Sequence, residues 1–483
     1  MSDALQSNGT QDDAVLVLKT ELSDIEIASI TPIYAVRPKD WEILKSQFDE
    51  VALNFAKARN FTGEAGQRVR LPNAQGQIAA VLYGAGPQED DAMGPIRMGG
   101  LSSVLPQGFY QLAYIPKDWT MNLALTAWGL GAYRFETYLK ETTQFPTLVV
   151  EDGTKLKEVL SLAGATALCR DLINTPAGDM GPVALQQSAM DLAAEFGAEL
   201  TTTIGDELLE KNYPMIHAVG RAAHEAPRLV EFEWGDPSHP RLAVVGKGIT
   251  FDTGGLNIKG ASGARLMKKD MGGAAHALAL AKLVMENDLP IRLHCLIAVA
   301  ENAISAGAYR PGDILSSRAG LTIEIDNTDA EGRLVLGDAL CKATESDPAL
   351  IIDFATLTGA ARVALGPQVP PFFCNREKPV ADILAQGEKQ IDPLWRMPLW
   401  APYYSMLSSP IADMKNSGGS FAGCVTAALF LQRFVKNTPW MHLDTYGWNP
   451  SSRPAHPKGG DMYGVRALYF WLKAGGLNGD LSK

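Results

Sequence analysis

The second half of the chain alternates short apolar runs with segments of helical spacing, and this alternation constrains the fold more than any other feature. Each run is about as short as a strand, and most of them are too apolar to keep one face in water. Such runs form largely parallel sheets that helices cover on both faces, with functional sites at the carboxyl ends of the strands. The runs are LAVVGKG, LHCLIAVA, LTIEID and LIIDFATLTG, and the clearest helical segment between them is GAAHALALAKLVMEN.

The first part of the chain shows the same alternation on a smaller scale. DAVLVLK and IAAVLYG predict strands, whereas KDWEILKSQFDEVALNFAKA and MNLALTAWGLGAYRFETYLK predict helices. A chain of 483 residues is also too long for one ordinary core, since domains average about 150 residues. We therefore predict an α/β fold with a smaller N-terminal α/β domain at 1–150, a linker helix and entry segment at 151–180, and a larger C-terminal α/β domain at 181–483 with a central, mostly parallel sheet covered by helices.

Charge and cysteine content exclude several classes of partner. The net charge of −11 gives no basic field for nucleic acid or an anionic membrane surface. Five cysteines without a CxxC pair indicate a reducing compartment. The first residues lack a basic segment followed by an apolar one, and no apolar run reaches the length of about 18 residues that spans a bilayer. We therefore expect a cytoplasmic protein with no nucleic-acid and no membrane partner.

Four carboxylates lie at or near the ends of the predicted strands: Asp252, Asp270, Asp329 and Glu331. Clustered carboxylates repel one another and stay ionised together only when cations neutralise them. Two divalent ions about 3.5–4 Å apart are a common solution in hydrolases, and oxygen-rich ligation suits Mg²⁺, Mn²⁺ or Zn²⁺. The pattern favours a metal site at this edge of the sheet.

Each acidic residue also has a simpler interpretation. Asp252 precedes Thr-Gly-Gly and could occupy a turn, and Asp270 could cap the helix that follows it. Asp329, Glu331 and Arg333 recur at every second position, as on one face of a strand, and that face could be solvated. The flanking LVLGDAL is too apolar for a solvent-exposed strand, and this favours the metal site. The GKG tripeptide lacks the spacing of a phosphate loop.

Three motifs resemble those of the leucyl aminopeptidase family of cytosolic dinuclear metallopeptidases. The decapeptide NTDAEGRLVL matches the family signature at every informative position, and similarity extends over roughly residues 165–470. The N-terminal part matches only weakly, mainly through GLGAYRFETYLK. The three motifs are VGKGITFDTGG, KKDMGGAA and NTDAEGRLVLGDAL.

The resemblance implies a role for each position. Lys247, Asp252, Asp270, Asp329 and Glu331 fall on metal-ligand positions for two divalent ions, Mn²⁺ or Zn²⁺. It implies that Asp252 and Glu331 bridge both ions, that Lys247 and Asp270 complete the tighter site, and that Asp329 completes the exchangeable one.

The resemblance also implies a reaction and an assembly. Lys259 and Arg333 fall on the two catalytic positions. A hydroxide that bridges the metals would attack the first peptide bond, Lys259 would stabilise the oxyanion, and a bicarbonate held by Arg333 would serve as the base. Peptides are the expected substrates, with a leucine-like preference at the first residue, and the expected assembly is a homohexamer.

Substrate contacts follow from the same resemblance. Met267, Thr356 and Gly359 fall on positions that line the pocket for the first side chain, and Leu357 falls on a backbone contact with the substrate. Core packing is an equally good interpretation of Met267. The loop after Lys259 departs from the family, because Gly260 replaces a frequent proline and residues 263–265 read Gly-Ala-Arg where Gly-Met-Asp is usual.

Two other functions compete with an aminopeptidase. A two-metal phosphoesterase would use similar acids, but the chain lacks the histidine-rich spacing of such enzymes. A non-catalytic relative acting as a binding or regulatory protein would be expected to have lost at least one of the seven metal and catalytic positions, and all seven are intact. His276, the histidine nearest to the acids, is better explained by helix packing than by metal ligation.

Overall fold

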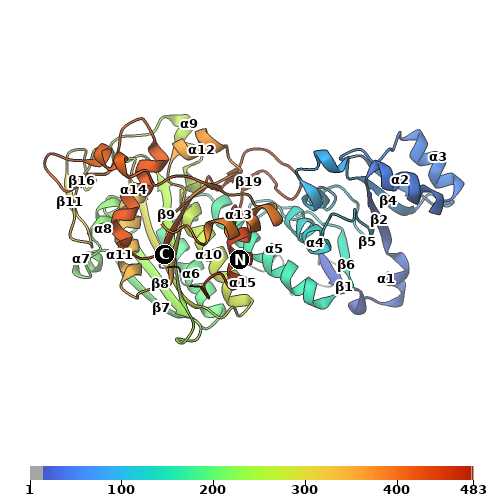
Figure 1. Ribbon diagram of the computed structural model, residues 1–483, viewed down its shortest axis with the longest axis horizontal. Helices are drawn as coiled ribbons and strands as arrows, with labels where there is room; N and C mark the ends of the chain where they lie inside the picture. Colours follow the sequence, from blue (N-terminus) through green and yellow to red (C-terminus); the bar gives the residue numbers. More distant parts are fainter. Residues whose placement is uncertain (1–14, 480, 482–483) are drawn as a thin grey trace. The chain divides into compact units, whose positions relative to one another are not determined.

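The computed structural model describes residues 15–479 and 481. The chain divides into two compact units, coloured by sequence in Figure 1. The first unit comprises Met1–Ala167 with Ser451–Lys458, and the second comprises Leu168–Pro450 with Gly459–Lys483. No helix within the described residues is both long enough and apolar enough to cross a membrane.

The first unit contains a six-stranded sheet in the order β1-β6-β5-β2-β4-β3. All neighbouring strands are parallel except β3 and β4, which run antiparallel. DAVLVLK and IAAVLYG supply β1 and β4, as the sequence predicts. The strands are β1 Leu16–Leu18, β2 Thr31–Val36, β3 Arg68–Pro72, β4 Ile78–Gly84, β5 Phe109–Tyr114 and β6 Thr147–Val150.

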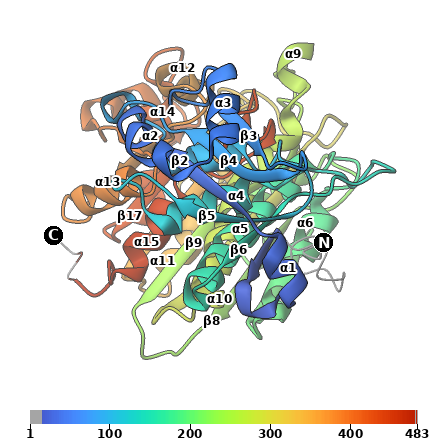
Figure 2. The ribbon, with the colours of Figure 1, turned by 90° about the vertical axis from the view of Figure 1, so that its right-hand side faces the viewer.

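The predicted helices of this unit are shorter than their sequence patterns. KDWEILKSQFDEVALNFAKA forms two helices, because Asp49 begins a new one by accepting a hydrogen bond from the Ala52 amide at 2.8 Å. Both helices lie beside β2, β3 and β4 (Figure 2), where the rings of Trp41 and Phe61 pack edge to face at 5.1 Å. The helices of this part are α1 Asp24–Ser29, α2 Pro38–Leu44, α3 Glu50–Ala58, α4 Met121–Gly131 and α5 Gly153–Asn174, the last continuing into the second unit.

The second unit contains an eight-stranded mixed sheet in the order β15-β14-β17-β13-β9-β10-β8-β7. The central strands β17, β13, β9 and β10 are parallel. At one edge β8 runs antiparallel to β10 and β7 antiparallel to β8, and at the other β14 runs antiparallel to β17 and parallel to β15. The strands are β7 Glu199–Ile204, β8 Arg228–Trp234, β9 Arg241–Asp252, β10 Arg292–Asn302, β13 Leu350–Ala355, β14 Pro371–Cys374, β15 Trp395–Arg396 and β17 Trp440–Asp444.

Helices cover both faces of this sheet, as expected for strands this apolar. One face packs against α8, α11 and α14 in a continuous core. The other packs against α6 and α10, and α15 packs on α10. These helices are α6 Pro182–Glu195, α8 Pro214–Gly220, α10 Gly272–Glu286, α11 Gly332–Thr344, α14 Gly423–Val435 and α15 Val465–Lys473.

One predicted strand does not join the central sheet. LTIEID contributes β12, Thr322–Glu324, to a separate three-stranded sheet with β11, Ile314–Ser316, and β16, Met414–Lys415. Thr322 and Glu324 are only partly buried, whereas Ile323 and Ile325 are buried in the core that α8, α11 and α14 share with the central sheet. The prediction of a central strand at LTIEID is therefore wrong.

Candidate metal centre

Strand β9 carries Lys247 and Asp252 to the carboxyl end of the central sheet. Both side chains are buried, with exposed fractions of 1% and 3%. The chain then turns at Gly254, whose φ is +89° and where a Cβ atom would lie 2.5 Å from the carbonyl oxygen of Asn257. Only glycine fits this turn without strain. Asp252 thus ends the strand and begins a tight turn, so the turn and ligand interpretations of this residue are compatible.

Asp270 lies in the short 3-10 helix Met267–Met271, which precedes α10. It does not cap α10, because the N-cap residue of that helix is Met271. Its carboxylate instead accepts hydrogen bonds from the Lys247 ammonium and from the Thr356 hydroxyl, the latter at 2.8 Å. The helix-cap interpretation of Asp270 is therefore wrong, and its carboxylate faces the end of β9.

Asp329 and Glu331 do not lie on a strand, although their spacing suggested one. Asp329 lies in a turn, and Glu331 is the N-cap residue of α11 with helical φ and ψ of −73° and −36°. The alternation of charges reflects a turn that runs into a buried helix. The side chain of Lys247 packs directly against Gly332. A Cβ atom at that position would lie 2.2 Å from the lysine Cε.

The two lysines form ion pairs with all four carboxylates. Lys247 contacts Asp270 and Glu331, the latter at 3.0 Å, and donates to the Thr356 carbonyl at 2.9 Å. Lys259 contacts Asp252 at 2.8 Å and also Asp329. Burial opposes the charge on each lysine, but the surrounding carboxylates outweigh it and raise the pKa of both lysines. The centre is therefore a compact array of alternating charges.

The carboxylates of Asp252, Asp329 and Glu331 are crowded enough to hold a cation. One oxygen from each lies within 4.8 Å of the others. Burial, followed by repulsion from Asp252, raises the pKa of Glu331 to about 8 and that of Asp329 to about 6. Ionised carboxylates held this close need more positive charge than two lysines supply. These residues fit one or more divalent cations.

A group of uncharged residues fixes these ligands in place. The Asn302 side-chain amide donates to Asp252 at 2.8 Å and to the Thr328 carbonyl at 3.1 Å, and the Tyr309 hydroxyl donates to the same carbonyl at 2.7 Å. None of these three residues was predicted from the sequence. Asn302 carried a recognisable signal, since it is a polar residue at the end of the apolar run that forms β10.

Arg333 follows Glu331 into the first turn of α11 and is 8% exposed. One terminal nitrogen donates to the Asn416 carbonyl at 2.8 Å, and the buried Nε has no partner among the residues that the structure describes. Burial lowers the pKa of Arg333 to about 10. The guanidinium therefore keeps its charge at neutral pH and has an unused donor, which suits a small anion.

The four predicted substrate contacts have different surroundings. Thr356 is buried and bonds to Asp270, so it supports a ligand. The Leu357 amide donates to the Asp444 carboxylate at 3.0 Å. Gly359 is the exposed first residue of α12, Gly359–Leu365, and Met267 is half-buried in the 3-10 helix that carries Asp270.

His276 is excluded from ligation by its hydrogen bonds. Its Nδ1 bonds to the Gly272 carbonyl at 2.7 Å, which requires Nδ1 to donate, and Nε2 accepts from the Tyr463 amide at 3.1 Å. Burial lowers its pKa to about 4, so the ring is neutral. Because both nitrogens are engaged, no lone pair is free for a metal, in agreement with the packing interpretation.

Two family models cover most of the chain. The model described as "Cytosol aminopeptidase family, catalytic domain" matches residues 167–469, and "M17 aminopeptidase, N-terminal domain" matches residues 31–151. A probable cytosol aminopeptidase of Geobacter sulfurreducens is 36% identical over 87% of this chain and 90% of its own length. One from Syntrophotalea carbinolica is 35% identical over 85% and 89%.

Solved structures agree with the sequence relatives. The cytosol aminopeptidase from Coxiella burnetii superposes with a TM-score of 0.89 at 42% identity, covering 95% of this chain and 99% of that one. The bottromycin maturation enzyme BotP in complex with Mn has a TM-score of 0.82 at 31% identity, covering 94% of this chain and all of its own. The residues that form the centre described above all lie within the matched region.

Proposed function

Because this chain belongs to the cytosol aminopeptidase family and is a metal-dependent hydrolase of amino-terminal residues, we propose how its own side chains divide that work. Lys247, Asp252, Asp270, Asp329 and Glu331 hold two divalent cations, Mn²⁺ or Zn²⁺. Lys259 and Arg333 act on the substrate side. The crowding of the Asp252, Asp329 and Glu331 carboxylates within 4.8 Å is the observation that carries this assignment.

The two cations share ligands in the proposed arrangement. Asp252 and Glu331 would contribute to both, Lys247 and Asp270 would complete the tighter site, and Asp329 would complete the exchangeable one. The burial of Lys247, Asp270 and Glu331 supports the tighter site, and the half-burial of Asp329 supports exchange with solvent. Lys247 must lose its proton to become a ligand, since only the neutral amine has a lone pair.

When bound, the cations would supply Lewis acidity, which lowers the pKa of a water nucleophile and polarises the scissile carbonyl. Lys259, freed from its ion pairs with Asp252 and Asp329, donates to the oxyanion that develops on the carbonyl. Arg333 would hold bicarbonate through its Nε, unpaired among the described residues, and the anion would supply the base that the proton transfer from nucleophile to leaving amine requires. The buried Nε of Arg333 supports this assignment.

The substrates that we propose are peptides with a free amino group and a leucine-like first residue. Met267, Leu357 and Gly359 would contact the first residue, and Thr356 would act indirectly through Asp270. The loop that follows Lys259 forms the exposed helix α9, Ala261–Ala264. Its departures from the family pattern at Gly260 and Arg265 make this loop the place where substrate preference would differ from that of relatives.

We also propose a homohexamer, as the resemblance implies. Analytical ultracentrifugation at micromolar concentration tests this proposal directly. A single species near 51.9 kDa, the mass of one chain, would contradict it.

Hydrolysis of amino-acid anilides tests the catalytic proposal. We expect Mn²⁺-loaded protein to release the aromatic amine from leucine anilide, and a chelator to abolish this release until Mn²⁺ is returned. Nitrophenyl phosphate, assayed in parallel, tests the phosphoesterase alternative. Metal-loaded protein that cleaves no anilide or dipeptide in a panel of first residues would overturn the proposal.

A further inference from the structure

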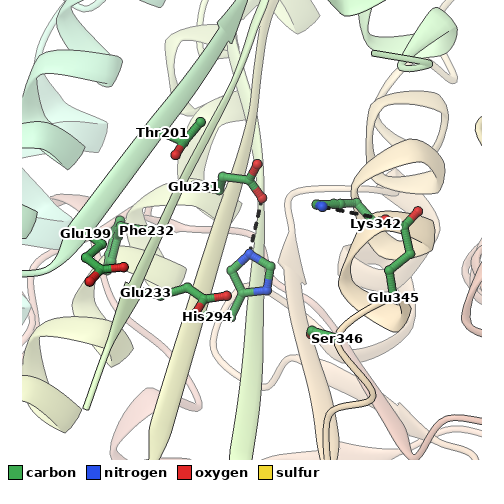
Figure 3. Close-up of a pocket in the computed structure, with 9 residues that line it drawn as sticks. All are labelled: Glu199, Thr201, Glu231, Phe232, Glu233, His294, Lys342, Glu345 and Ser346. Atoms are coloured by element: carbon green, nitrogen blue, oxygen red, sulfur yellow. Dashed lines mark hydrogen bonds and ion pairs between the residues drawn. The ribbon is translucent and has the colours of Figure 1, made fainter. Parts of the chain in front are cut away.

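A polar cavity lies at the opposite end of the central sheet from the metal centre. It has a volume of about 420 Å³ and is bounded by β7, β8 and β10 on one side and by the end of α11 on the other (Figure 3). His294 lines the cavity near the start of β10, whereas Asn302, which binds Asp252, ends that strand. His294 and Asn302 are therefore about 26 Å apart along β10, at about 3.3 Å per residue.

The strand register gathers polar residues on this face of the sheet. Glu199 pairs with Glu233, which pairs with His294, and Thr201 pairs with Glu231 in the neighbouring row. Because side chains alternate along a strand, these residues all point to the same side. That side faces Lys342, Glu345 and Ser346 of α11 and the segment after it (Figure 3).

Two of the four glutamates in the cavity are already neutralised. Glu233 pairs with Arg241 at 2.8 Å and with Arg292 at 2.5 Å. Glu345 pairs with Arg318 at 2.7 Å and with Lys342 at 3.5 Å. These pairs also engage the single lysine of the lining.

The other two glutamates give the cavity a surplus of negative charge. Glu199 and Glu231 have no lysine or arginine partner within the described part of the chain; the partner that Glu231 does have is His294 at 3.2 Å. A cationic ligand would therefore be attracted to this end of the cavity.

His294 adds an unused hydrogen-bonding atom to this charge. The side chain is 4% exposed, and Nε2 must donate to Glu231, because a carboxylate only accepts. In the neutral ring Nδ1 is then an acceptor. It is buried without a partner in the described residues and points into the space between the sheet and α11 (Figure 3). Buried polar atoms are seldom left unpaired, so a donor is missing here.

We propose that this cavity binds a small organic molecule through a primary ammonium group. An ammonium offers three donors and no acceptor, which complements the Glu231 carboxylate and Nδ1 of His294, while Glu199 adds negative charge at the rim. A bare metal ion fits less well, because within the described residues the metal-binding cluster of acids is the one at Asp252, Asp329 and Glu331. A diamine or a free amino acid would each supply the group.

Calorimetric titration of the Mn²⁺-loaded protein with 1,4-diaminobutane and with L-leucine tests this inference and distinguishes the two sources. We expect at least one of them to bind, and Glu231→Gln to weaken that binding by tenfold or more. Leucine can also occupy the metal centre as a product, so for leucine the diagnostic signal is a binding event that Glu231→Gln removes.

Two further variants keep the test independent of folding defects. Glu199→Gln alters an exposed residue and should weaken binding several-fold, whereas Glu388→Gln on α13, Val380–Lys389, should leave binding unchanged as the matched control. Anilide hydrolysis should be the same in all three variants, because the cavity is remote from the metal centre. The inference is overturned if neither amine binds, if Glu231→Gln binds them as the unaltered protein does, or if Mn²⁺ alone occupies the cavity.

Discussion

At the scale of single residues, the centre depends on charges that balance only when cations are present. Lys247 and Lys259 now occupy the space between carboxylates, and the pKa of Glu331 is raised to about 8 by burial and by Asp252. A buried carboxyl that holds its proton near neutral pH is poised to exchange it for a metal ion. The predictions at this scale separate metal binding from catalysis.

Glu331→Gln should weaken metal binding and activity together. A neutral amide cannot balance two cations, and the loss of a ligand should reduce affinity by tenfold or more. Metal content after dialysis, measured by mass spectrometry, and anilide hydrolysis check this result, with Glu388→Gln as the control. Full metal content in Glu331→Gln would show that this carboxylate is not a ligand.

Arg333→Ala should keep both metals and lose rate. General acid–base catalysis contributes about 10²–10⁴-fold, so kcat should fall within that range. The measurement is kcat at saturating Mn²⁺. Added bicarbonate should not restore the rate of the variant. Loss of metal from Arg333→Ala would contradict the proposed division of labour.

Metal affinity should rise with pH between about 6 and 8. Protons compete with cations for Glu331, whose raised pKa of about 8 places this competition in the neutral range, and for Lys247, whose pKa is also raised. Binding should therefore release protons. Calorimetry of Mn²⁺ binding in two buffers of different ionisation enthalpy measures this release. An affinity independent of pH, with no proton release, would refute the assignment of these ligands.

At the scale of elements, the carboxyl ends of β9 and β10 and the start of α11 position the residues of the metal centre. The sequence correctly predicted the strands of the central sheet apart from LTIEID, because runs such as LAVVGKG leave few alternatives to a buried strand. It failed for Asp329, Glu331 and Arg333, where a charge spacing of two fits both a strand and a turn entering a helix. The turn and helix bring Gly332 against Lys247, a contact between distant segments that local spacing does not encode.

Asn302→Ala tests how β10 supports β9. Removing the amide takes a donor from the buried Asp252 carboxylate and from the Thr328 carbonyl, which should lower the free energy of unfolding by about 1–3 kcal/mol. Loss of such a supporting contact also weakens metal affinity, by about 10–100-fold. Denaturant unfolding and metal titration check both effects. An unaltered metal affinity would show that Asp252 needs no such support.

At the scale of the whole molecule, the two-unit α/β organisation and the family were recognisable from the sequence. The assignment of Ser451–Lys458 to the first unit was not, since nothing in the composition of that segment sets it apart. The cavity was likewise not predictable. Antiparallel pairing of β7 and β10 with β8 brings together Glu199, Glu231 and His294 from distant segments. Such long-range pairings follow from the packed fold.

The central claim is that five side chains of this molecule hold two catalytic cations, and crystallographic anomalous scattering from Mn²⁺-loaded protein tests it most directly. The account predicts two anomalous peaks per chain, both within bonding distance of Asp252 and Glu331, with Lys247 and Asp270 completing one site and Asp329 the other. A single peak, or peaks elsewhere in the chain, would contradict it.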